Sequence, residues 1–88
     1  MVEHKLIIKN KYGLHARPAA LFVETASKYD AEVTITKDDV EVNGKSIMGL
    51  LVLAAEKGTE IILRSNGKDE VTVIQALVKL LEGKLDDE

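Results

Sequence analysis

The stretch Gly-Leu-His-Ala-Arg-Pro-Ala (residues 13–19) decides the fold, because there a strand-like apolar run gives way to a helical pattern. It contains Pro18, the one proline of the chain. Proline is tolerated in the first turn of a helix, since the N–H that it lacks would have no partner inside the helix. A helix that begins between Ala16 and Pro18 therefore has His15 at or next to its N-cap.

Chemistry at His15 follows from that position. The first backbone N–H groups of a helix have no intrahelical partner, and the positive end of the helix dipole faces the same side. Arg17 adds a full positive charge. A neutral imidazole is a nucleophile, so these surroundings suit a phosphoryl group. The alternative from spacing alone is that His15 only caps the helix and Arg17 is a solvated charge.

Apolar patterning elsewhere predicts the element order β-α-β-β-α-β-α. We expect strands at residues 2–9, 32–37, 40–42 and 59–64, and helices at residues 16–28, 47–55 and 69–82. In the second strand Val33 and Ile35 alternate strictly with threonines, which indicates one buried face. The order predicts a single α+β domain over residues 1–88, with helices on one face of a four-stranded sheet and split β-α-β topology.

Each of the two longer helices carries one apolar stripe for the core. The stripe of the first helix comprises Ala19, Phe22, Val23 and Ala26, and that of the last comprises Val71, Ile74, Leu77, Val78 and Leu81. Gly83 is expected to end the last helix, and the acidic tail Asp86-Asp87-Glu88 is expected to fray.

The middle helix is apolar on every side. Ser46 before it is typical of an N-cap, and Gly58 after it of a left-handed C′ residue. Complete burial is hard to arrange in so small a domain, so we expect Leu50 and Leu53 to face the core. The outward residues are expected to form a docking patch: Ile47, Met48, Leu51 and part of Val52. A buried strand is the competing interpretation of so short a run.

A second face of the first helix also suits a partner. It contains Ala16, Ala20 and Glu24, and the small side chains near His15 would allow a close approach. The alternative is that the alanines only favour helix formation.

Composition excludes several classes of function. A net charge of −3 with only 3% aromatic residues argues against a nucleic-acid binder. The chain has no cysteine, so thiolate metal sites are excluded, and we expect neither a metal nor a cofactor. No signal peptide and no apolar run of about 20 residues is present, which favours a cytoplasmic protein without membrane insertion. A monomer is expected.

Ser46 has two interpretations. It is a plain N-cap, or it is a regulatory phosphorylation site whose phosphate the helix dipole would tolerate. About two added negative charges would then lie beside Ile47 and Met48.

The residues that carry this chemistry resemble the HPr family, the histidine-containing phosphocarriers of the bacterial phosphoenolpyruvate-dependent sugar phosphotransferase system. The similarity covers essentially the whole chain and is most specific at residues 13–19, then at Lys-Ser-Ile-Met-Gly (45–49) and Thr-Ala-Ser-Lys-Tyr (25–29). It implies an open-faced β-sandwich of four antiparallel strands and three helices. It also implies that His15 takes a phosphoryl group from enzyme I and passes it to enzyme IIA domains, with Arg17 assisting.

The same resemblance implies a regulatory branch at Ser46, through HPr kinase/phosphorylase and catabolite control protein A. Tyr12 departs from the small hydroxyl residue of many relatives, and Glu24 adds negative charge to the docking helix. His15 argues against the paralogue Crh, which lacks the active histidine. A nitrogen-branch paralogue, or a mainly regulatory module that acts through Ser46, remains the alternative.

Overall fold

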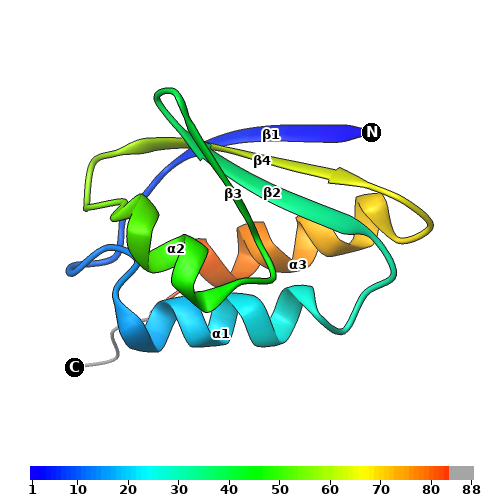
Figure 1. Ribbon diagram of the computed structural model, residues 1–88, viewed down its shortest axis with the longest axis horizontal. Helices are drawn as coiled ribbons and strands as arrows, with labels where there is room; N and C mark the ends of the chain where they lie inside the picture. The colour runs from blue at the N-terminus through cyan, green and yellow to red at the C-terminus, as the bar shows by residue number, and fades with distance from the viewer. Residues whose placement is uncertain (84–88) are drawn as a thin grey trace.

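A computed structural model of the protein describes residues 1–83, which form four strands and three helices in the expected order (Figure 1). The elements are β1 (Val2–Ile7), α1 (Ala16–Ala26), β2 (Glu32–Lys37), β3 (Val40–Asn43), α2 (Ile47–Leu53), β4 (Glu60–Asn66) and α3 (Glu70–Glu82). None of the helices in residues 1–83 has the length and apolar character that a membrane span requires. The tail that we expected to fray lies outside the described residues.

The strands form one antiparallel sheet in the order β1-β4-β2-β3. Leu6 lies opposite Ile61, and Ile35 lies opposite Leu63, so the apolar residues of neighbouring strands share one face. The helices cover that face and leave the other open (Figure 1). The predicted α+β class and open-faced sandwich are thus confirmed.

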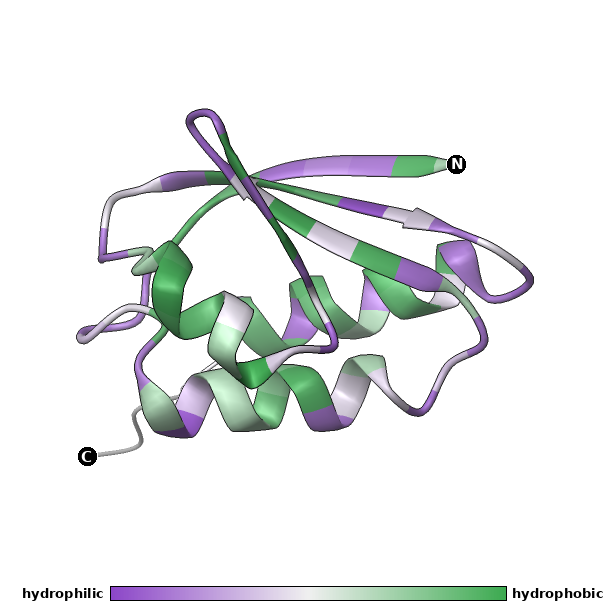
Figure 2. Ribbon diagram, in the orientation of Figure 1, coloured by the Kyte–Doolittle hydropathy of each residue, from purple (hydrophilic) through white to green (hydrophobic). Residues whose placement is uncertain are grey.

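The core lies between the sheet and the helices. Phe22 of α1, Leu50 of α2 and Leu77 of α3 are fully buried against Ile35 and Leu63 of the sheet. The apolar residues gather toward this layer in α1 and α3, whereas α2 is apolar along almost its whole length (Figure 2). The helical prediction for residues 47–53 is confirmed, and the buried-strand interpretation is wrong.

The C-terminal ends of α1 and α2 are set by local turn geometry. α1 ends at Ala26 and not at Lys28, because the N–H of Lys28 donates to Thr25 and that of Tyr29 to Ala26 in tighter three-residue turns. α2 ends at Leu53 and not at residue 55. Its C-cap, Ala54, is left-handed with φ of 53°.

Gly58 is not the C′ residue of α2 that the sequence predicted, because the helix already ends at its C-cap Ala54. The φ of Gly58, 90°, is left-handed as expected, but Gly58 lies in the following turn and donates its N–H to the carbonyl of Ile8 at 2.8 Å. The helix is closed instead by Ala54, whose N–H donates to Leu50 at 3.3 Å, and by Lys37, whose ammonium donates to the carbonyls of Leu53 and Ala54.

The apolar stripe of α3 was partly misassigned. Val71 is 54% exposed, whereas Val73 is fully buried. Ile74, Leu77 and Leu81 are buried as predicted and Val78 is half-buried, so the buried face of α3 is rotated away from Val71 and toward Val73.

The strand ends also differ from expectation. β1 stops at Ile7 rather than Lys9, β3 extends to Asn43, and β4 continues beyond Arg64 to Asn66. Ser65 is buried within β4, which its polarity did not suggest. Its hydroxyl donates to the carbonyl of Glu70 at 2.7 Å, so the polar group is satisfied inside the sheet.

Candidate functional site

The loop before His15 is held by its own backbone and by the segment after α2. The N–H of Gly13 donates to the carbonyl of Asn10 at 3.1 Å, and the amide of Asn10 donates back to the carbonyl of Gly13. Gly13 has φ of 68°, and a Cβ there would overlap the carbonyl oxygen of Ala55. The N–H of Leu14 donates to that oxygen at 2.8 Å. The backbone that leads into His15 is therefore fixed on both sides.

His15 is the N-cap of α1, as the position of Pro18 predicted. Its backbone is extended, with φ of −88°, and its carbonyl accepts the first helical bond from Ala19 at 2.9 Å. The side chain is exposed and makes no capping hydrogen bond to the helix. The helix therefore uses the backbone of His15 and leaves the ring at the surface.

The first turn of α1 presents a limited set of donors. Ala16 and Arg17 are its first residues, and their N–H groups have no carbonyl four residues earlier in the helix. Pro18 comes third and has no N–H. The Arg17 side chain is exposed, and within residues 1–83 it forms no hydrogen bond or ion pair. An anion on His15 would thus meet two amides and one exposed guanidinium.

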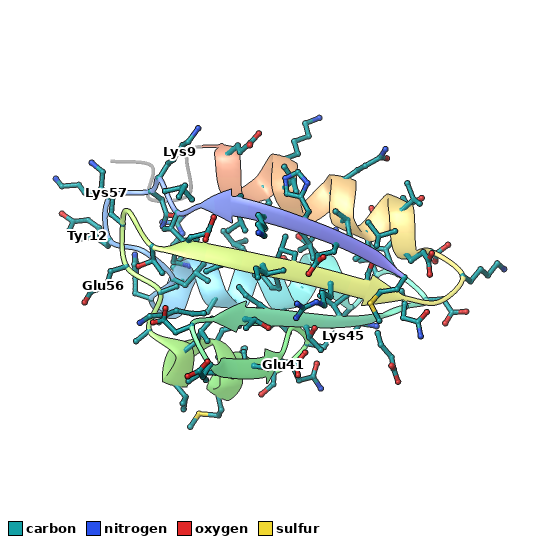
Figure 3. All side chains as sticks on the ribbon, turned by 90° about the horizontal axis from the view of Figure 1, so that it is seen from above. Lys9, Tyr12, Glu41, Lys45, Glu56 and Lys57 are labelled. Carbon is teal, nitrogen blue, oxygen red and sulfur yellow. The ribbon has the colours of Figure 1, made fainter. Side chains whose placement is uncertain are left out.

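Tyr12 lies against His15. The ring centroids are 5.7 Å apart and the rings are nearly perpendicular, at 79°. The ammonium of Lys11 lies 5.1 Å from the centroid of the Tyr12 ring. Tyr12 also shares one end of the molecule with Lys9, Glu56 and Lys57 (Figure 3).

A hollow of about 300 Å³ lies between this loop and the C-terminal end of α2. Tyr12, His15 and Ala16 line one side, and Leu51 and Ala54 line the other. The hollow joins His15 to the outer surface of α2, so a protein that approaches His15 meets both elements.

The outer surface of α2 is exposed as predicted. Met48 and Val52 are 69% and 70% exposed, and Ile47 and Leu51 are also exposed, while Leu50 and Leu53 are buried. α1 packs beside α2 (Figure 1). On α1 the residues Ala16, Ala20 and Glu24 are also exposed. We call the four exposed apolar residues of α2 the α2 patch. Its use for docking stays a prediction.

Ser46 is the N-cap of α2, as predicted. Its Oγ accepts a hydrogen bond from the N–H of Gly49 at 3.0 Å, and the side chain is half-buried. Ser46 comes directly before Ile47, so a group added to its oxygen would lie at the edge of the α2 patch.

Sequence reasoning missed two features of this site. The contact between the rings of Tyr12 and His15 was not predicted. The close approach of the Ala55 carbonyl to Gly13 was not predicted either. The one available signal was Gly13 itself, because a glycine between two apolar or aromatic residues often marks a close backbone approach or positive φ.

Comparison with known proteins identifies two related kinds of protein, HPr and the HPr-like protein Crh. The family model described as "PTS HPr component phosphorylation site" matches residues 2–83. The phosphocarrier protein HPr of Xylella fastidiosa is 48% identical over 88 residues, which cover 100% of this chain and 99% of the relative. The HPr-like protein Crh of Halalkalibacterium halodurans is 48% identical over 82 residues, 93% of this chain and 98% of the relative.

Solved structures agree with the architecture. HPr of Thermoanaerobacter tengcongensis superimposes with a TM-score of 0.95 at 50% identity, over 100% of this chain and 99% of that one. Crh of Bacillus subtilis, described as an intertwined dimer with a swapped domain, has a TM-score of 0.76 at 43% identity, over 96% of this chain and 97% of that one.

Proposed function

This chain belongs to the HPr family of phosphocarriers of the phosphotransferase system, and we propose that it accepts a phosphoryl group on His15 from phosphorylated enzyme I. It then donates the group to enzyme IIA domains during coupled sugar uptake. The observation that carries this proposal is an exposed imidazole at the N-cap of α1, beside free helix amides and the Arg17 guanidinium.

The transfer is a displacement at phosphorus. A neutral ring nitrogen of His15 forms a bond to phosphorus as the bond between phosphorus and the donor group breaks. The amides of Ala16 and Arg17 and the guanidinium of Arg17 supply hydrogen bonds to the phosphoryl oxygens. In the next step the acceptor's nucleophile attacks, and the bond to His15 breaks.

Incomplete charge compensation suits a carrier. An ordinary helix offers a further amide at its third residue, but Pro18 occupies that position and has none. The phosphoryl group is therefore held by fewer donors than a permanent anion site would supply. A carrier needs such a balance, because it must release its load to the next protein.

The α2 patch and the exposed face of α1 serve as the docking surface. Enzyme I and the enzyme IIA domains would bind there in succession, through small and transient interfaces. Ala16 and Ala20 allow close approach, whereas Glu24 repels an acidic partner. The chain itself acts as a carrier without independent turnover.

The test is incubation with phosphoenolpyruvate and enzyme I, followed by intact-mass and acid-stability analysis. We expect one acid-labile phosphate on wild-type protein and none on the His15→Ala variant, which keeps its fold because the ring makes no capping bond. A wild-type protein that takes up no phosphate from enzyme I, that is, one that is not charged, would overturn the carrier proposal. Unfolding of His15→Ala would instead favour a purely capping role.

We also propose that Ser46 is a regulatory phosphorylation site. The half-buried hydroxyl lies beside the α2 patch, so a phosphate there would repel a partner with an apolar or acidic surface. HPr kinase/phosphorylase would install it from ATP, and catabolite control protein A would recognise the product. An acid-stable phosphate after incubation with ATP and the kinase supports this role, and its absence with an active kinase contradicts it.

Two alternatives are separated by phosphorylation reactions of the same kind. A nitrogen-branch paralogue would be charged faster by the nitrogen-branch enzyme I than by the sugar-branch protein. A mainly regulatory module would take phosphate only on Ser46. We propose a cytoplasmic monomer, although the B. subtilis Crh structure is a dimer. Light scattering of the purified protein tests the monomer.

A further inference from the structure

We propose that Tyr12 is a positioning residue, whose ring holds the imidazole of His15 in the orientation required for phosphoryl transfer. This inference rests on the proposed function of His15 and assigns a role to a neighbouring side chain. The rings meet at 5.7 Å and 79°, within the range of edge-to-face aromatic pairs.

The helix does not orient the imidazole. His15 supplies its backbone to the N-cap, but its side chain makes no capping hydrogen bond. An exposed histidine has two rotatable bonds, and transfer to phosphorus requires one ring nitrogen in line with the donor. A neighbouring ring that contacts the imidazole reduces the range of orientations that it samples.

Tyr12 is itself placed by a fixed backbone. Tyr12 and His15 flank Gly13 and Leu14, whose N–H groups bond to Asn10 and Ala55. Asn10 and Leu14 are both buried, and Gly13 fits closely against the backbone of Ala55. The two side chains therefore project from one turn whose backbone is hydrogen-bonded on both sides, which favours their contact.

The exposure of Tyr12 also needs a physical reason. Tyr12 is 58% exposed, so burial in the core does not account for its position. The ring contacts a cation, Lys11, and the imidazole, and both contacts use an aromatic surface. Leucine at this position would keep a similar bulk but lose these contacts, and phenylalanine would keep the ring but lose the hydroxyl.

The variants Tyr12→Leu and Tyr12→Phe test the proposal with two measurements. The first is the proton NMR shifts of the His15 ring in the uncharged protein, which a nearby aromatic ring displaces. We expect Tyr12→Phe to keep the wild-type shifts and Tyr12→Leu to lose the displacement. Unchanged shifts in Tyr12→Leu would overturn the proposal, whatever the outcome of the enzyme I reaction.

The second measurement is the steady-state rate of charging by enzyme I. Misorientation of a reacting group costs up to about a hundredfold, and a partly restricted ring should cost less, so we expect Tyr12→Leu to lower kcat several-fold with little change in KM. Tyr12→Phe should retain the wild-type kcat. A loss confined to KM would make Tyr12 a partner contact, and equal losses in both variants would assign the effect to the hydroxyl. Either result overturns the positioning role while leaving the carrier function intact.

Discussion

The backbone N–H of Leu14 donates to the carbonyl oxygen of Ala55 at 2.8 Å. This bond joins the loop before the phosphoryl-accepting His15 to the segment after α2, and so links the reacting ring to the docking helix. Gly13 makes the approach possible, because any side chain there would overlap the same carbonyl.

Gly13→Ala is therefore expected to destabilise the protein and to disturb the site. Left-handed backbone costs alanine about 1–2 kcal/mol, and the overlap with Ala55 adds to that cost. Gly58→Ala is the matched control, since Gly58 is also left-handed but has nothing within 4 Å of its Cβ position. Urea unfolding should show a larger loss for Gly13→Ala, and charging should fall only in that variant. Equal losses would argue against a steric role for Ala55.

Periodicity was sufficient to predict much of this fold. Alternation in β2 identified Val33 and Ile35 as buried, and the apolar pattern of α2 separated Leu50 and Leu53 from the exposed patch. The N-caps His15 and Ser46 were also found from local sequence, because capping depends on neighbouring residues.

Features that depend on tertiary contacts could not be predicted. The contact of Tyr12 with His15 forms across a turn that contains Gly13, whose φ is positive, and a linear pattern does not show which side chains meet across a turn. The burial of Val73 instead of Val71 depends on how α3 is rotated against the sheet. The C-cap Ala54 is left-handed, a conformation that glycine adopts far more readily than alanine. The sequence therefore predicted the left-handed residue at the next glycine, Gly58.

Ala54→Gly should stabilise the protein. Ala54 has φ of 53°, a conformation that costs a residue with a Cβ about 1–2 kcal/mol. The greater flexibility of glycine in the unfolded chain offsets part of that gain, which leaves about 0.5–1 kcal/mol. Urea unfolding measures the change. Ala55→Gly is the control: residue 55 is buried and has no positive φ, so that variant should lose stability. A destabilised Ala54→Gly would contradict the prediction.

The α2 patch should matter for charging and not for stability. Met48→Ala removes a side chain that is 69% exposed, so the free energy of unfolding should change by less than about 0.5 kcal/mol. The KM for enzyme I should rise several-fold. Leu50→Ala, in the same helix, removes a fully buried side chain and should cost about 2–5 kcal/mol. A Met48→Ala variant with wild-type KM would exclude Met48 from the docking surface.

Ser46 variants separate capping from regulation. Ser46→Ala loses the acceptor for the N–H of Gly49 and should cost about 1 kcal/mol in urea unfolding. Ser46→Asp keeps a good N-cap and should be close to wild type in stability. It adds a negative charge beside the α2 patch, so kcat/KM for charging by enzyme I should fall, whereas Ser46→Ala should charge normally. Unimpaired charging of Ser46→Asp would count against a regulatory role.

Glu70 should make stability depend on pH in the acid range. Its carboxylate accepts the N–H of Gly67 at 3.0 Å and the N-terminal ammonium at 3.2 Å, and these contacts hold the pKa of Glu70 below its ordinary value of 4.5. A group whose pKa is lower in the folded state stabilises the fold above its unfolded pKa, and that contribution is lost as pH falls through the folded pKa.

Wild type should therefore unfold at a higher temperature than Glu70→Gln near neutral pH, and the difference should shrink below pH 4.5, the ordinary value of the group. Glu24→Gln, an exposed position on α1, is the control and should show no such convergence. A gap between wild type and Glu70→Gln that stays constant from neutral to acid pH would mean that the charge of Glu70 does not contribute to stability.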